Sequence, residues 1–437
     1  MTATAIGLEK RARLAFAIVT VSATVSAAEV NVGPSDYLRA LQNLQPGDTL
    51  MLSSGVYAGG LPLRGITGTA EAPIVVRGPD DQTAVFIADN CCNTVQLTDV
   101  SHIEIRNLTL DGAGTSGPFG VDARGVCHDI TIENLRIVNY DANQQIVGIS
   151  TKGPAWNWVI RRNTIVGAGT GMYLGDSDGT KPFVNGVIEY NVVLDTLGYS
   201  LQIKHQLPRP TDVGLPTGDS RTIIRHNVFS KQNNASVGEM ARPNVLVGHL
   251  PLQGDGSRDR YEIYGNFFYQ NPVEALFQGE GNIVLHDNLF VNAFGSAVHI
   301  QPHHDKPRAV TVYRNTVVAS GAGIRILGAD SAFEQRTVAN AVFAALPIVG
   351  PSQASNVTGD YSAATAYLNS PTAPIGSLDL YPKPGKLSGL GDQPSFDEYT
   401  DGDRDFNSDL RSGEFAGAYG GEGTNPGWRL ALTTKGR

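Results

Sequence analysis

The chain has 437 residues, of which 50 are glycine and only 17% are charged, and its formal net charge is −9. Abundant glycine with few charges is typical of a turn-rich all-β protein and argues against a helical bundle. An acidic chain without a basic tract is also poorly suited to nucleic acid, so we expect no nucleic-acid partner.

Residues 1–28 have the pattern of an export signal peptide. Lys10, Arg11 and Arg13 form a basic start, residues 14–25 are mostly apolar, and small residues follow at 26–28. The apolar run is too short to cross a bilayer, and no later run is long enough either. We therefore expect an exported protein, periplasmic or secreted, with no integral membrane span. A signal that stays uncleaved as an N-terminal anchor is the alternative.

The first element of the mature chain is a predicted amphipathic helix over Asp36 to Leu44. It is followed by two strand-like segments at 46–52 and 55–57. A stack of strands leaves its end sheets open, so we expect this helix to cap the first turn of a repeat domain.

The strongest pattern is a repeat marked by asparagine. Each unit has a short alternating strand, an asparagine, a β-branched strand, a glycine-containing turn and a third strand. Successive asparagines are 22 to 39 residues apart, a period typical of a solenoid, and they are Asn107, Asn134, Asn163, Asn191, Asn227, Asn266, Asn288, Asn315 and Asn340. Asparagine tolerates the left-handed backbone of a tight corner, and its side chains can hydrogen-bond along the stack.

These units predict an all-β fold, a single-stranded right-handed parallel β-helix of about ten coils with three strands per coil. The β-helix with its cap should span residues 29–350, and residues 351–437 should form an irregular region packed on the helix or extending it. A leucine-rich horseshoe is the rival architecture, but regular leucines are missing. We expect a monomer.

The start of the repeat, with Pro46-Gly47-Asp48-Thr49-Leu50 and Gly55-Val56-Tyr57, resembles pectate-lyase-like β-helix proteins, and most closely the chondroitinase B and alginate lyase family. The resemblance implies β-elimination by a Lys and an Arg on successive coils, beside a calcium ion held by acidic side chains. Lys204 matches that Lys. His249 stands near the expected Arg, and Leu197 and Tyr199 stand where acids are expected.

Side chains on the outer face of the third strand predict a groove. If Ile203, Val247, Phe277, Ile300 and Ile326 point inward, two outward columns result. The first holds Tyr173, Gln202, Leu246, Leu276, His299 and Arg325; the second holds Lys204, Gly248, Gln278 and Gln301. Just beyond them lie Asp176, His205, His249, Glu280 and His303. Long insertions after Lys204 and Ser230 bring Arg209, Glu239 and Arg242, and insertions in repeat proteins concentrate on the binding face.

These residue types suit the elimination of a uronate, which requires a base, an acid and groups that neutralise the carboxylate. The predicted catalytic residues are Lys204 and His249 as bases and Tyr173, His205 and His299 as acids. The predicted substrate-binding residues are Gln202, Arg209, Arg242, Gln278, Glu280, Gln301, His303 and Arg325. The expected function is therefore cleavage of a uronate-containing polysaccharide, with that polysaccharide as the partner.

Three other functions remain open: a glycoside hydrolase, a C5-epimerase and a non-catalytic polysaccharide-binding surface protein. No cofactor is expected except the calcium that the resemblance implies, and no residue is assigned as a metal ligand. His299, His303 and His304 have ligand-like spacing, but a sugar-binding groove has the same composition. Among the three cysteines, Cys127 with either Cys91 or Cys92 is the expected bridge; three reduced, buried cysteines are the alternative.

Overall fold

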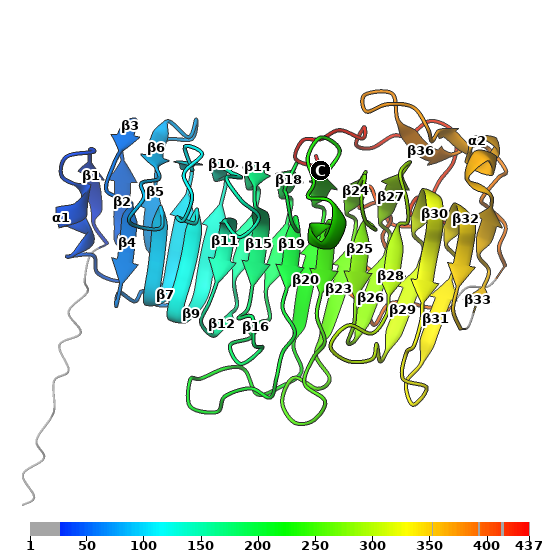
Figure 1. Ribbon diagram of the computed structural model, residues 1–437, viewed down its shortest axis with the longest axis horizontal. Helices are drawn as coiled ribbons and strands as arrows, with labels where there is room; N and C mark the ends of the chain where they lie inside the picture. The colour runs from blue at the N-terminus through cyan, green and yellow to red at the C-terminus, as the bar shows by residue number, and fades with distance from the viewer. Residues whose placement is uncertain (1–26, 352, 392–393, 412–414, 437) are drawn as a thin grey trace, which may run out of the picture.

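The computed structural model describes residues 27–351, 353–391, 394–411 and 415–436, so nearly all of the predicted export signal lies outside the described residues. The described chain forms an elongated stack of coils (Figure 1). Its 34 main strands join in one continuous sheet in which every pairing is parallel. The predicted parallel β-helix is confirmed. Within the described segments, no helix is both long and apolar enough to cross a membrane.

Three columns of strands run along the stack, and we call them sheets 1, 2 and 3. Sheet 1 contains β1 (Glu29–Val32), β2 (Thr49–Leu52), β5 (Ile74–Arg77), the ends of β7 (Val95–Arg106) and β9 (Val121–Glu133), β13 (Val159–Arg161), β17 (Val187–Glu189), β20 (Arg221–Arg225), β23 (Arg260–Tyr264), β26 (Ile283–His286), β29 (Val310–Tyr313), β31 (Gln335–Val338) and β33 (Gln353–Ala354).

Sheet 2 contains β3 (Gly55–Tyr57), β6 (Ala84–Ile87), β8 (Thr109–Asp111), β10 (Arg136–Tyr140), β14 (Thr164–Ala168), β18 (Val192–Leu194), β21 (Val228–Ser230), β24 (Phe267–Tyr269), β27 (Leu289–Asn292), the starts of β30 (Thr316–Ile326) and β32 (Ala341–Val349), and β34 (Val357–Gly359). The coils thus continue past the predicted end at residue 350.

Sheet 3 is the column of third strands, whose outer face carries the predicted groove. It contains β4 (Leu61–Arg64), the starts of β7 and β9, β11 (Val147–Thr151), β15 (Thr170–Leu174), β19 (Leu201–Ile203), β22 (Val245–Val247), β25 (Phe277–Gly279), β28 (Val298–Ile300) and the ends of β30 and β32. Two short strands, β12 (Ala155–Trp156) and β16 (Phe183–Val184), extend the corner between sheets 3 and 1.

The first coil is capped as predicted, although the helix is shorter than the pattern indicated. Helix α1 spans Tyr37–Leu41, and both of these residues are buried. The Tyr37 ring meets the Tyr57 ring edge-on at 5.1 Å, and its hydroxyl donates to the Gly60 carbonyl at 2.7 Å. The helix therefore covers the open end of the apolar core.

The asparagine ladder exists, but its corner differs from the prediction. From Asn163 to Asn356, each side-chain amide donates to the next asparagine oxygen at 2.9 to 3.0 Å. In these coils the left-handed residue is the one before the asparagine, such as Arg162 at φ 56°. Only in the early coils do Asn107 and Asn134 adopt positive φ themselves. Because the left-handed residue comes one position earlier, the asparagine amide points inward, where it also donates to a carbonyl of an adjacent coil.

The C-terminal region packs across the outer face of sheet 2. After Gly359 the chain forms a 3₁₀ turn, η2 (Tyr361–Ala363), helix α2 (Ala364–Tyr367) and the antiparallel pair β35 (Leu368–Ser370) and β36 (Asp379–Pro382). In Figure 1 this orange-to-red segment returns along the C-terminal half of the stack. Its apolar side chains form one cluster with outward residues of sheet 2, including Leu380, Phe406 and Tyr419 against Val228, Phe267 and Leu289.

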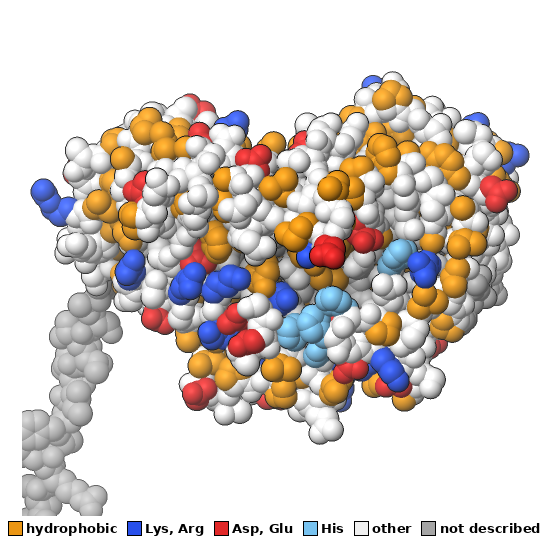
Figure 2. Space-filling model, in the orientation of Figure 1, with side chains coloured by type: hydrophobic (Ala, Val, Ile, Leu, Met, Phe, Trp, Pro, Cys, Tyr) orange, Lys and Arg blue, Asp and Glu red, His pale blue; other side chains and the backbone are white. Residues whose placement is uncertain are grey.

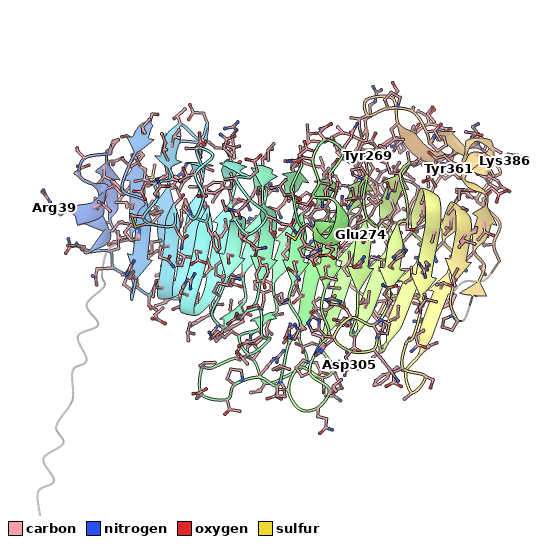
Figure 3. All side chains as sticks on the ribbon, in the orientation of Figure 1. Arg39, Tyr269, Glu274, Asp305, Tyr361 and Lys386 are labelled. Atoms are coloured by element: carbon pink, nitrogen blue, oxygen red, sulfur yellow. A yellow bond between two sulfur atoms is a disulfide. The ribbon has the colours of Figure 1, made fainter. Side chains whose placement is uncertain are left out.

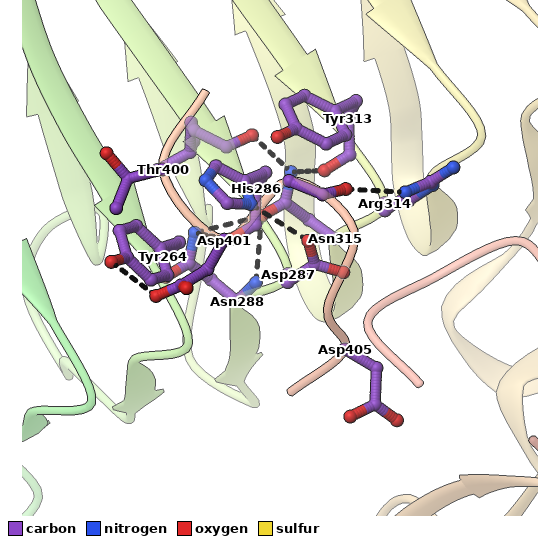
Figure 4. A network of polar contacts seen from close by, with 12 residues as sticks. Tyr264, His286, Asp287, Asn288, Tyr313, Arg314, Asn315, Thr400, Asp401 and Asp405 are labelled. Carbon is purple, nitrogen blue, oxygen red and sulfur yellow. Dashed lines mark hydrogen bonds and ion pairs between the residues drawn. The ribbon is translucent and has the colours of Figure 1, made fainter. Parts of the chain in front are cut away.

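A polar corner fixes the same region to the end of sheet 1 (Figure 4). The Tyr264 hydroxyl donates to the Asp401 carboxylate at 2.9 Å, and the Arg225 guanidinium donates to it at 3.3 Å. The Phe396 ring stacks on the Tyr313 ring at 3.7 Å. The C-terminal region therefore engages sheets 1 and 2 along the C-terminal half of the stack.

The predicted cysteine pairing is wrong. Cys91 and Cys92 form a disulfide with each other, and Cys127 is a buried free thiol. The two neighbours lie on an exposed turn, where the Asp89 carboxylate accepts both of their backbone N–H groups. Cys127 points into the core at the corner of β9, away from that turn.

Candidate active site

Parallel pairing places one row of outward side chains along sheet 3. The row is Tyr173, Gln202, Leu246, Gln278, His299 and Arg325. One predicted position in this row, and one in the second row that contains Lys204 and Gly248, are wrong by two residues. Leu276 is fully buried, Gln278 takes its place, and Glu280 continues the second row after Gly248.

Gly279 explains this error in register. It pairs with Val247 and Ile300, both buried, and therefore points inward. A Cβ there would lie 2.6 Å from the Ile283 Cδ1 atom, so a larger residue would require the Ile283 side chain to move. Because glycine gives no apolar signal, the sequence pattern placed Phe277 at the inward position that Gly279 occupies.

The second row carries four basic side chains, of which only Lys204 was predicted. Arg64 pairs with Thr98, and Thr98 pairs with Arg124. Thr151 pairs with Ala123, so Lys152, the residue after Thr151, stands in the same row as Arg124, the residue after Ala123. In Figure 2 basic side chains lead across this face toward a group of histidines. Each basic residue comes directly after the last inward-pointing residue of its third strand. Aligning the repeats by those inward residues could therefore have revealed Arg64, Arg124 and Lys152.

Tyr173 lies between two of these lysines. The Lys152 ammonium is 3.5 Å from the centre of the Tyr173 ring, and the Lys204 ammonium is 5.8 Å away. Burial, and then the nearby Asp176 carboxylate, raise the pKa of Tyr173 to about 12. Burial lowers the pKa of both lysines. At neutral pH the phenol therefore stays protonated, while each lysine loses its proton more readily than in water.

An open pocket of about 410 Å³ adjoins this group, lined by Lys152, Tyr173, Tyr199, Gln202 and Arg242 among others. Arg242 comes from the long loop before β22, just after the 3₁₀ turn η1 (Gly238–Met240). Its guanidinium lies 5.9 Å from the centre of the Tyr199 ring and donates to the Glu239 carbonyl at 2.8 Å. The loop thus brings the predicted Arg242 to the same pocket as Tyr173.

Arg209 is not brought to the groove. Its side chain is only 3% exposed and forms an ion pair with Asp259. It also donates to the Pro216 carbonyl at 2.5 Å. The predicted substrate contact of Arg209 is therefore replaced by a structural role, in which it holds two insertions together.

A histidine cluster follows Lys204 along the face. The His205 ring stacks on the His304 ring at 3.9 Å, with the His249 ring 5.4 Å from His205 and the His303 ring 4.5 Å from His304. Burial, and then the charges of His304 and Lys204, lower the pKa of His205 to about 4. At neutral pH His205 is therefore an uncharged ring rather than a proton donor.

Glu280 organises this cluster instead of facing substrate as predicted. Its side chain is fully buried, and one carboxylate oxygen accepts the backbone N–H groups of His303, His304 and Asp305 at 2.9 to 3.0 Å. The other oxygen lies 3.4 Å from the His304 ring. Figure 3 shows Asp305 on this turn and Glu274 on the loop across sheet 3.

The predicted acid His299 lies apart from Tyr173. It stands between Gln278 and Arg325 on β28, and Gln301 follows it at the end of the same strand. Four strand spacings separate β15 from β28, which is about 19 Å. Burial, and then the Arg325 charge, lower the pKa of His299. His299 therefore cannot act on the same bond as Tyr173, although both line the same face.

The calcium that the resemblance implied has no acidic cluster in this groove, since Tyr199 lines the pocket where an acid was expected. Among the described residues, two groups of three side chains have the spacing of metal ligands. They are Asp89 with Cys91 and Cys92, whose sulfurs are bonded to each other, and His102 with His128 and Asp129.

Comparisons with known proteins agree on the fold. Residues 147–343 match the family model described as the right-handed beta helix region. A crystal structure of pectate lyase Pel9A is 14% identical with a TM-score of 0.50, covering 91% of this chain and 97% of that one. The alginate lyase from Paenibacillus sp. str. FPU-7 is 17% identical with a TM-score of 0.49, covering 74% and 99%.

A third similar structure has a different activity. The mannuronan C-5 epimerase AlgE4 A-module of Azotobacter vinelandii is 16% identical with a TM-score of 0.41, covering 75% of this chain and 90% of that one. No curated protein matches the sequence. The chain therefore has the right-handed parallel β-helix fold that the sequence resemblance implied, and its likeness to these solved structures is one of fold.

Proposed function

We propose that the chain is a carbohydrate-active enzyme that cleaves a uronate-containing polysaccharide by β-elimination on sheet 3. The observation that carries this proposal is Tyr173, which lies between Lys152 and Lys204 in a pocket shared with Arg242. The lyases and the epimerase that share the fold act on acidic glycans by name, which is consistent with this substrate class.

Each group has a place in the reaction. Lys152 and Arg242 neutralise the uronate carboxylate, which stabilises negative charge on the adjacent carbon. Lys204, in its neutral form, removes the proton from that carbon. A double bond forms as the glycosidic C–O bond breaks, and protonated Tyr173 gives its proton to the departing oxygen. Arg64 and Arg124 extend the positive row and contact further carboxylates of the polymer.

The test is a panel of uronate polymers, with ultraviolet absorbance of the unsaturated product as the measurement. Lys204→Ala and Tyr173→Phe should each lower kcat by about 10²- to 10⁴-fold, the usual effect of removing a general base or acid. Lys386→Ala and Tyr361→Phe, on the C-terminal region, are matched controls and should leave kcat unchanged. Equal activity of Lys204→Ala and the control would contradict the assignment.

Two other activities are distinguished by the product. A hydrolase adds one water to each cleaved bond, and it needs two carboxyls about 5–10 Å apart. In the groove Glu280 is buried under the His303–Asp305 turn, and Asp176 pairs with Lys181 at 3.1 Å, so this mechanism is less favoured. An epimerase would exchange the carbon-bound proton with solvent without cleavage. Glycan binding with neither product nor exchange would indicate a non-catalytic protein.

A further inference from the structure

A second column of side chains lies at the corner between sheets 3 and 1, away from the groove. His102, Asp129, Asn157 and Asn185 all have positive φ, between 53° and 58°, and occupy this corner on successive coils. The Asn185 amide donates to Asn157 at 2.7 Å, and the Asn157 amide donates to the Asp129 carboxylate at 3.0 Å. The amide ladder stops there, because the next coil offers the imidazole of His102.

A second imidazole joins this end of the ladder. His128 Nδ1 lies 2.6 Å from the other oxygen of the Asp129 carboxylate. The His102 ring approaches the His128 ring edge-on at 5.7 Å, and one ligand atom from each of these three residues lies within 4.8 Å of the others. The His128 ring also stacks on Trp156 at 4.4 Å. The His128 and Asp129 side chains are 28% and 30% exposed, so solvent can reach them.

We propose that His102, His128 and Asp129 form a binding site for a divalent transition metal of the Zn²⁺ or Ni²⁺ class. Two imidazoles and one carboxylate are a ligand set for such ions, with water in the fourth position, and nitrogen donors disfavour Ca²⁺ and Mg²⁺. Tetrahedral ligands about 2.1 Å from a metal lie about 3.4 Å from each other. The ligand atoms are at most 4.8 Å apart, so the widest pair closes by about 1.4 Å at most. His128 Nδ1 and the Asp129 oxygen, 2.6 Å apart, separate by about 0.8 Å as the ion replaces the proton between them, and side-chain rotation can supply both movements.

The surroundings support the site. Asn157 holds the Asp129 carboxylate from behind, as outer hydrogen-bond partners orient metal ligands. His102 belongs to β7, whereas His128 and Asp129 belong to β9, so a bound ion joins two coils near the N-terminal end. The site shares no residue with the groove, and the proposed metal binding does not depend on the proposed lyase activity.

Trp156 provides a direct readout. The full chain has three tryptophans, Trp156, Trp158 and Trp428. Only Trp156 stacks on a proposed ligand, so an ion bound to His128 would lie near this indole, and bound Ni²⁺ quenches the fluorescence of a nearby indole. Chelator-treated protein titrated with Ni²⁺ should show partial, saturable quenching of fluorescence. Zn²⁺ should compete with Ni²⁺ and raise the melting temperature, because an ion that binds only the folded chain stabilises it.

The test variants replace the two proposed ligands that lie in line with the amide ladder. His102→Asn and Asp129→Asn should each weaken Ni²⁺ binding at least tenfold while the fold is kept, because asparagine suits positive φ and would extend the amide ladder. Trp156→Phe should abolish most of the quenching but keep the Zn²⁺ stabilisation. His304→Gln, in the groove cluster, should change neither. Quenching that survives both ladder variants, that disappears in His304→Gln, or that never saturates would overturn the proposal.

Discussion

The chemistry of the groove depends on how burial changes the acidity of a few side chains. Burial lowers the pKa of Lys204, and the carboxylates of Glu280 and then Asp176 raise it again. The same Asp176 also raises the pKa of Tyr173. A neutral lysine and a protonated phenol are the forms that the proposed elimination requires, so this one carboxylate contributes to both limits of the active pH range.

Replacing Asp176 should therefore move the whole pH profile. In Asp176→Asn the lost negative charge lowers the pKa of Lys204, so the base is neutral at lower pH. It also lowers the pKa of Tyr173, so the acid is lost at lower pH. Both limbs of kcat/KM against pH should shift to lower pH. Asp178→Asn, an exposed position on the same loop, is the matched control. A shift of only one limb, or an equal shift in the control, would contradict this account.

At the scale of single elements, the asparagine ladder supports the coils from within. Asn266 donates to the Ile224 carbonyl at 2.8 Å and to Asn288 at 2.9 Å. Its oxygen accepts the backbone N–H of Asn227 at 2.9 Å. These groups are fully buried, so no water can replace the asparagine if it is removed.

Asn266→Ala should accordingly lower the free energy of unfolding of the neighbouring coils by about 2–5 kcal/mol, the cost of leaving two or more buried polar groups unpaired. Amide hydrogen exchange of β20 to β26 and the melting temperature measure this loss. Asn233→Ala, in the exposed loop after β21, removes one exposed hydrogen bond, from the Asn233 amide to the Asp195 carboxylate at 3.0 Å, and should cost about 1 kcal/mol or less. Equal losses in the two variants would show that the ladder contributes little.

At the scale of the whole molecule, the C-terminal region determines which face remains open. It covers sheet 2 with a continuous apolar cluster and is also fixed near its end by Lys435. The Lys435 ammonium is buried, donates to His226 at 3.1 Å and to the Gly265 carbonyl at 3.0 Å, and burial lowers its pKa to about 7. The groove proposed to hold the polymer lies on sheet 3, away from this apolar cluster.

Loosening this cover should affect the C-terminal region before the coils. Leu380→Ala removes a fully buried leucine between that region and sheet 2, which costs about 2–5 kcal/mol. Limited proteolysis should then cut within residues 360–436 much faster than in the original protein. Leu410→Ala changes a leucine that is 64% exposed on the same region and should leave the cleavage rate unchanged. Rapid cleavage among the coils instead would contradict the separate docking of this region.

The coil stack, its cap, the asparagine ladder and the outward position of Lys204 followed from the sequence, because period-2 alternation and repeated corners are local patterns. The pairing of Cys91 with Cys92 and the register at Gly279 did not. A disulfide depends on which loops meet, and an inward glycine gives no apolar signal. Arg209 and Glu280 were also misread, since charged residues look alike in sequence whether they face solvent or a buried partner.

The sequence alone therefore determined the fold and the face on which a groove lies, because each coil repeats the same local requirement. Only the tertiary structure decided which groups act together. Stacking placed Lys152 and Lys204 on either side of Tyr173 and folded Arg242 over the same pocket, while it left His299 about 19 Å away. The distance between two side chains on different coils depends on loop lengths and on what packs behind each strand. The sequence of a single repeat contains neither.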